Sequence, residues 1–159
     1  MCNTGIINVS APSPEIAKVD EGEGYLVVAR ELFKGVEALS TIQGIPPRSC
    51  ALIAAHALEC ALKAYLWNRV KRSELKSREV RHNIEALWNL AYFEKTLGIP
   101  EQLPNWVRIL CDGHGPNFYF RYQEGKNKTI VNGGQTPALE PMAIELHELL
   151  KQVEQAIKV

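Results

Sequence analysis

The sequence has no excess of charge of either sign, because 18 Lys and Arg residues balance 18 Asp and Glu residues. Proteins that coat nucleic acid regardless of its sequence carry a clear basic excess, so this balance argues against that class. The sequence also lacks a run of eighteen apolar residues without charges, and its N-terminus lacks a basic-then-apolar signal. We therefore expect a cytoplasmic chain with no membrane partner.

Cysteine is scarce and scattered. The four residues Cys2, Cys50, Cys60 and Cys111 show neither close pairing nor the spacing of metal ligands. In a chain without a secretion signal, such cysteines are expected to be reduced and mostly buried. A metal site made of His56, Glu59, His82 and His114 lacks a tight motif such as His-Glu-x-x-His, so we expect no metal and no other cofactor.

The chain does have the length and apolar content of one globular domain. Its 159 residues are 46% hydrophobic, and a chain of this length is long enough to bury roughly 70% of the surface that its unfolded form exposes. We expect residues 1–22 to form an N-terminal arm and residues 23–159 to form a single all-α domain, a four- to five-helix bundle. Apolar periodicity predicts helices over 25–40 and 51–66, and three others. The first starts near Ile84 with Asn83 as its N-cap, the second runs from Pro104 to an end at Gly113, and the third starts after Pro137 with Thr136 as its N-cap.

Residues 117–131 have a different pattern. They combine an aromatic stretch, turn residues and β-branched residues, which predicts a small β-hairpin inserted in the bundle. Arg121 and Tyr122 lie on this predicted hairpin and have two interpretations. They could grip a phosphate and stack a base, or they could anchor the hairpin against the bundle.

The segment 51–66 is apolar almost all round, as expected for the central helix of a bundle. Its polar exceptions, His56, Glu59 and Lys63, share one helical face, and Glu59 precedes Lys63 by the four positions that favour an ion pair. We interpret them as a structural polar network with His82, because a buried charge must be paired. The alternative is that this face is an active site.

A basic segment follows the central helix. Between residues 69 and 81, six basic residues stand against two acidic ones: Arg69, Lys71, Arg72, Lys76, Arg78 and Arg81 against Glu74 and Glu79. Such a run is usually a solvated face, but it is also the best electrostatic site for nucleic acid or an acidic protein. Arg72, Arg78 and Arg81 are the candidate nucleic-acid contacts.

Three stretches, in order, resemble the HEPN superfamily (higher eukaryotes and prokaryotes nucleotide-binding domains). The central helix carries Ala-His-Ala-Leu-Glu-Cys-Ala-Leu-Lys-Ala-Tyr-Leu at 55–66. His-Asn-Ile at 82–84, followed by Leu87, is similar to the family's start of the next helix. His114-x-Pro116 followed by Arg121-Tyr122 is similar to a string found in uncharacterised bacterial members. The resemblance covers residues 48–159.

The resemblance implies a helical bundle that forms a homodimer and acts in a bacterial stress, defence or toxin–antitoxin setting. Active members are metal-independent ribonucleases with an Arg and a His that are separated by four to six residues and lie in a cleft shared by two protomers. Arg108 and His114 match this spacing, with His114 as general base on a ribose hydroxyl and Arg108 on the phosphate. Ile109 and Pro116 depart from the signature, so the resemblance alone leaves catalysis open.

Two functions from different classes follow. The first is binding of RNA or a nucleotide, with or without cleavage. The second is a non-catalytic module of the same fold whose groove holds a cognate protein partner, which suits the overall neutrality of the chain and the imperfect Arg–His signature.

Overall fold

A computed structural model of the chain describes residues 20–44, 46–115 and 137–158. Within these ranges all regular secondary structure is helical, in agreement with the predicted all-α class. In chain order the helices are α1 (Glu21–Thr41), α2 (Pro47–Leu66), α3 (Arg72–Leu75), α4 (Ile84–Phe93), α5 (Asn105–His114) and α6 (Leu139–Ile157). The predicted hairpin at 117–131, with Arg121 and Tyr122, lies outside the described residues, as does most of the predicted arm.

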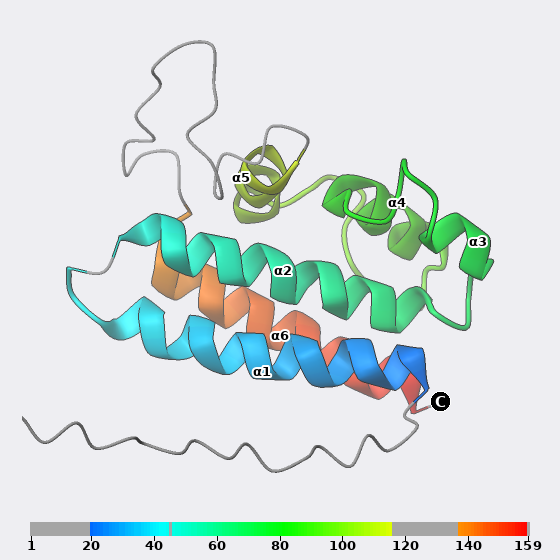
Figure 1. Ribbon diagram of the computed structural model, residues 1–159, viewed down its shortest axis with the longest axis horizontal. Coiled ribbons are helices and arrows are strands. Elements are labelled where there is room, and N and C mark those ends of the chain that lie inside the picture. Colours follow the sequence, from blue (N-terminus) through cyan, green and yellow to red (C-terminus); the bar gives the residue numbers. More distant parts are fainter. Residues whose placement is uncertain (1–19, 45, 116–136, 159) are drawn as a thin grey trace, which may run out of the picture.

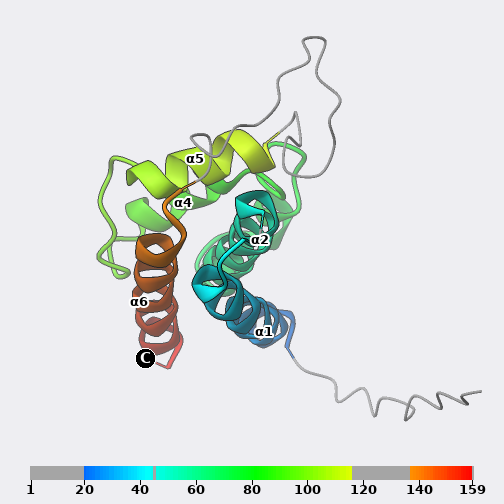
Figure 2. The same ribbon diagram turned by 90° about the vertical axis from the view of Figure 1, so that its left-hand side faces the viewer.

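Helix α2 is the centre of the bundle. It packs against α1, α6, α4 and α5, and most of its side chains are buried, from Cys50 through Leu66. Figures 1 and 2 show α1, α2 and α6 running side by side, with α4 and α5 across another face of α2. The small alanine side chains of α2 allow this close approach on several sides, which confirms the prediction for the segment 51–66.

By length and hydropathy, α2 also meets the description of a membrane span. However, 78% of its most apolar window is buried inside the bundle. Burial of this kind is typical of the core helix of a folded domain.

The start of α4 follows from local chemistry. Asn83 precedes the helix, and its side-chain oxygen accepts a hydrogen bond from the backbone N–H of Ala86 at 3.1 Å. This contact satisfies one of the amide groups that every helix start leaves without a partner. The predicted N-cap at Asn83 is therefore confirmed, and the residue before it, His82, is held at the edge of the helix.

Three helix ends differ from the sequence prediction. Helix α1 begins at Glu21 rather than Tyr25, and α6 begins at Leu139 with Ala138 as its N-cap rather than Thr136. Helix α5 does not stop before Gly113 but continues to His114, with Gly115 as its C-cap. The amide of Gly115 donates to the carbonyl of Cys111 at 2.9 Å, so the last turn closes after the glycine that was predicted to break it.

Candidate functional site

One buried carboxylate joins three parts of the bundle. Glu59 of α2 is 3% exposed, and its Oε1 accepts hydrogen bonds from Lys63 Nζ at 2.7 Å and from His82 Nδ1 at 3.0 Å. Its Oε2 lies 2.7 Å from Nε2 of His114, the last residue of α5. The predicted contacts of Glu59 with Lys63 and His82 are thus confirmed, and His114 is a third partner that the sequence did not reveal.

These contacts keep Glu59 ionised. Burial on its own raises the pKa of the carboxyl group, but hydrogen bonds from His114 and Lys63, with the charge of Lys63, outweigh it and lower the pKa from 4.5 to about 2. An ionised carboxylate can only accept hydrogen bonds, so both imidazoles must donate to it. His82 therefore carries a proton on Nδ1, and His114 carries one on Nε2.

The second nitrogen of His114 has an unusual environment. The side chain of His114 is 1% exposed, yet its Nδ1 has no hydrogen-bond partner among the described residues. A buried polar atom without a partner costs free energy unless something else satisfies it. Because Nε2 donates to Glu59, Nδ1 is an acceptor when the ring carries a single proton. It is therefore suited to bind a hydroxyl or amide group, or to take up a proton.

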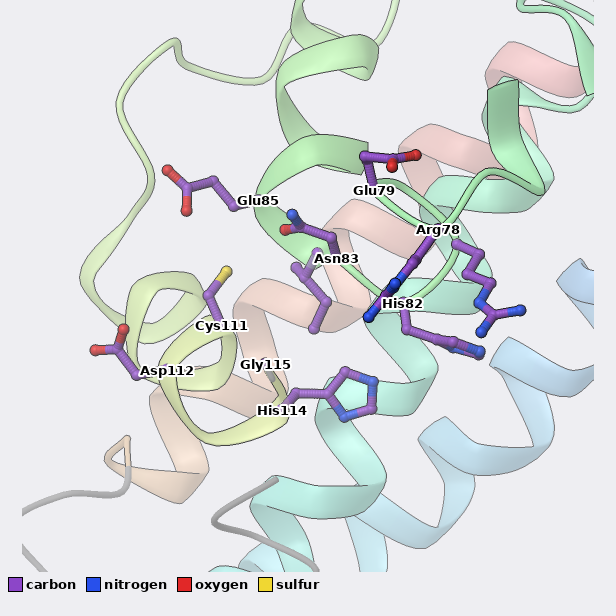
Figure 3. A pocket seen from close by; sticks show the side chains of 11 residues that line it. Arg78, Glu79, His82, Asn83, Glu85, Cys111, Asp112, His114 and Gly115 are labelled. Atoms are coloured by element: carbon purple, nitrogen blue, oxygen red, sulfur yellow. The ribbon is translucent and has the colours of Figure 1, made fainter. Parts of the chain in front are cut away.

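A pocket of about 900 Å³ opens beside this pair of histidines. Its walls come from residues 78–85, the loop before α4 and the start of that helix, and from the end of α5. Figure 3 shows Arg78, His82 and Asn83 on the first wall and Cys111, Asp112 and His114 on the second. Arg81 also lines the pocket, whereas the Glu85 and Asp112 carboxylates lie on the side away from His82.

On the wall formed by residues 78–81, two basic residues stand against one acidic residue, Glu79. Arg78 and Arg81 supply two guanidinium groups, and the N-terminus of α4 adds the partial positive charge of its first amide groups. Planar guanidinium groups and helix N-termini are the groups that proteins commonly use to hold phosphate. The arrangement is therefore suited to a phosphate beside the two imidazoles.

The cysteine in the pocket wall, Cys111, has a thiol pKa well above its ordinary value. Burial raises the pKa of the Cys111 thiol to about 12, and the carboxylates of Glu85 and Asp112 add to this shift. A thiol with such a pKa stays protonated at neutral pH, which removes thiolate chemistry from the candidate reactions. Among the residues that the structure describes, no group of three or more His, Cys, Asp or Glu side chains could hold a metal ion.

The structure separates the two residues of the predicted Arg–His pair. His114 lines the pocket, but Arg108 is exposed on the first part of α5, where its guanidinium donates to Asn105 Oδ1 at 2.7 Å. Six residues along one α-helix turn the chain by about 600°, which is about 120° short of two full turns, so the two side chains leave α5 in different directions. Within the described residues, His114 therefore lines the same pocket as Arg78 and Arg81, and Arg108 does not line it.

The basic segment is divided in a similar way. Arg72 and Lys76 lie over the ring of Trp67 at 4.8 and 5.5 Å from its centroid, at the end of α2. Arg69 donates to the carbonyls of Tyr65 and Ala156, and so caps the C-terminal ends of α2 and α6. Of the charged residues of this segment, Arg78, Glu79 and Arg81 line the pocket. Of the predicted polar face of α2, His56 is exposed, whereas Glu59 and Lys63 are buried.

These residues define an all-α protein with a polar pocket, in which two histidines share one buried carboxylate. The chain matches no known family model, and comparisons with curated proteins and with solved structures give no match either.

Proposed function

We propose that the protein is a HEPN-like, cytoplasmic RNA-binding protein that holds an RNA phosphate in the pocket between α4 and α5 and cleaves RNA without a metal ion. The single observation that carries this proposal concerns His114. Its Nδ1 is buried and has no hydrogen-bond partner among the described residues, and His114 lines the same pocket as Arg78 and Arg81. The three sequence stretches that resemble the superfamily support the choice of RNA as the ligand.

The chemistry assigns a role to each group. Arg78 and Arg81 hold the non-bridging oxygens of a phosphodiester, where they also oppose the charge that develops on phosphorus oxygens during attack. His114 accepts a proton from the adjacent ribose 2′-hydroxyl through Nδ1. Glu59 accepts a hydrogen bond from Nε2 of His114, and this contact fixes the tautomer and the orientation of the imidazole ring. Lys63 balances the charge of the Glu59 carboxylate.

Binding of a fluorescently labelled single-stranded RNA, followed by anisotropy at low salt, tests the first half of the proposal. The double variant Arg78→Gln with Arg81→Gln is expected to bind about tenfold more weakly or worse, because it loses two charge-assisted contacts. Lys34→Gln with Lys151→Gln is the matched control, since it removes two exposed charges from α1 and α6 and is expected to bind like the parent. Equal affinity of the pocket variant and the parent protein would rule out this phosphate site.

The resemblance also leads us to propose a homodimer. A stable dimer needs a contact that buries roughly 1,200 Å² or more in total. Light scattering during size-exclusion chromatography should then give twice the mass of the chain at micromolar concentration. The mass of a monomer at every concentration would contradict this part of the proposal.

A second function is supported by a different observation. Several large apolar side chains are exposed on the bundle, among them Phe93 at 71% and Ile144 at 60%. Exposed aromatic residues are typical anchors of protein interfaces, which favours the alternative of a non-catalytic module that binds a cognate protein. Under this alternative, purification from the native host yields a stoichiometric protein partner that is lost in Phe93→Ser, and RNA binding is absent.

A further inference from the structure

We infer that His82 is a second catalytic residue of the pocket, and that it works with His114 as a general acid and base pair tethered by Glu59. This inference rests on the proposed RNA ligand and deepens it. Each imidazole donates one N–H to a different oxygen of the same carboxylate, so Nε2 of His82 and Nδ1 of His114 are the two nitrogens left for a ligand. Both residues line the same pocket.

The different exposure of the two rings suits two different tasks. The His82 side chain is 60% exposed at the rim of the pocket, whereas that of His114 is 1% exposed. An exposed ring exchanges protons with water and can carry a second proton on Nε2. A buried ring that is already bound to Glu59 offers a dry acceptor, which favours proton transfer from a hydroxyl group that is held beside it.

The reaction balances with these two groups alone. His114 Nδ1 takes the proton of the ribose 2′-hydroxyl while the 2′-oxygen forms a bond to phosphorus. The bond from phosphorus to the 5′-oxygen breaks, and His82 Nε2 gives its proton to that oxygen. The products are a 2′,3′-cyclic phosphate and a 5′-hydroxyl end, with His114 protonated and His82 neutral. Hydrolysis of the cyclic phosphate with the two roles reversed restores both rings.

Two conservative variants remove one nitrogen each and keep the contact with Glu59. Asn places its side-chain N–H₂ where Nδ1 of a histidine lies, and Gln places it where Nε2 lies. His82→Asn and His114→Gln therefore retain a donor for Glu59 and lose only the nitrogen that faces the ligand. Retained melting temperature and RNA affinity within about threefold of the parent protein would show that fold and binding are preserved. His147→Gln, which changes a histidine of α6 that packs against Phe33, is the matched control.

The leaving group separates the acid from the base. An RNA with one 5′-bridging oxygen replaced by sulfur has a leaving group that departs without protonation. We expect His82→Asn to slow cleavage of the ordinary RNA by about 10²- to 10⁴-fold and to cleave the sulfur substrate within about tenfold of the parent protein. His114→Gln should slow both substrates, and His147→Gln neither.

The other outcomes separate the role of His82 from the proposed function. If the parent protein cleaves RNA and His82→Asn is unaffected, or loses both substrates equally, the role of His82 is overturned and the proposed function stands. If the parent protein binds RNA but cleaves neither substrate, the histidine pair is overturned and only RNA binding remains. If the parent protein fails to bind RNA at low salt, the proposed function itself is lost.

Discussion

Glu59 illustrates how one side chain can determine both stability and chemistry. It lies in the most buried helix of the bundle, where an unpaired charge would cost several kcal/mol, and it is stabilised by a lysine and two histidines from three segments. The cost of its burial is thus offset by contacts that also orient two imidazoles. A hydrophobic residue at this position would leave Lys63 buried without its counter-charge and both rings without a fixed tautomer.

The pKa of Glu59 predicts how stability depends on pH. The folded-state pKa of about 2 lies below the ordinary value of 4.5, so ionised Glu59 stabilises the fold above pH 4.5, and this contribution is lost as the pH falls toward 2. Glu59→Gln leaves Lys63 buried without its counter-charge, so we expect a loss of roughly 3–5 kcal/mol in the free energy of unfolding at pH 7. Urea unfolding of the parent protein and of Glu59→Gln at pH 7, 4 and 3 measures the difference between their free energies of unfolding.

The difference in the free energy of unfolding between the parent protein and Glu59→Gln should decrease as the pH is lowered. The parent protein then loses the stabilisation by ionised Glu59, which the variant already lacks. Glu148→Gln is a suitable control, since its ion pair with Lys151 lies on the exposed face of α6. Its effect should stay small at every pH. If Glu59→Gln lowers the free energy of unfolding by the same amount at every pH, the charge of Glu59 does not stabilise the fold.

At the scale of helices, the start of α1 is fixed by a close approach to the end of α2. A Cβ atom added at Gly22 would lie 2.7 Å from Cδ1 of Trp67. That ring cannot easily move, because Asp20 accepts its N–H at 3.1 Å and Arg72 lies over its face. Gly22 therefore allows the two helices to meet.

Two glycines on the same helical turn give a matched test of this contact. Gly22→Ala should destabilise the protein by about 1–3 kcal/mol, because it forces the ring of Trp67 aside. Gly24→Ala meets nothing within 4 Å and should stabilise the helix by about 0.5–1 kcal/mol. Thermal unfolding, followed by circular dichroism, gives the melting temperatures of both variants and of the parent protein. Similar shifts for both variants would contradict the packing argument.

The same scale shows what the sequence could and could not predict. An apolar pattern all round α2, an Asn before α4 and a Glu–Lys pair four residues apart are local signals, and each prediction from them is confirmed. The contact of His114 with Glu59 joins residues 55 positions apart, and no local signal specifies it. Gly113 indicated an earlier end for α5, although Gly115 and Pro116 were the better stop, because the residue before a proline disfavours helix.

At the scale of the whole molecule, the balanced charge makes the two arginines of the pocket important for RNA binding. With no general basic field, the salt dependence of affinity reports the phosphates that are actually contacted. Each phosphate neutralised on a single strand contributes a slope of about −0.7 in a plot of log affinity against log salt, so the one phosphate that Arg78 and Arg81 hold together should contribute about −0.7. Arg78→Gln with Arg81→Gln should lose this part of the slope.

Anisotropy titrations between 50 and 200 mM salt cover the range in which counterion release dominates the affinity. Lys34→Gln with Lys151→Gln should keep the parent slope, because these charges lie on helices that do not line the pocket. A parent slope much steeper than about −0.7 would mean that further cations, such as Arg121, contact other phosphates of the strand. If Arg78→Gln with Arg81→Gln has the same salt slope as the parent protein, the phosphate does not bind at Arg78 and Arg81. The RNA would then also lie away from the two histidines.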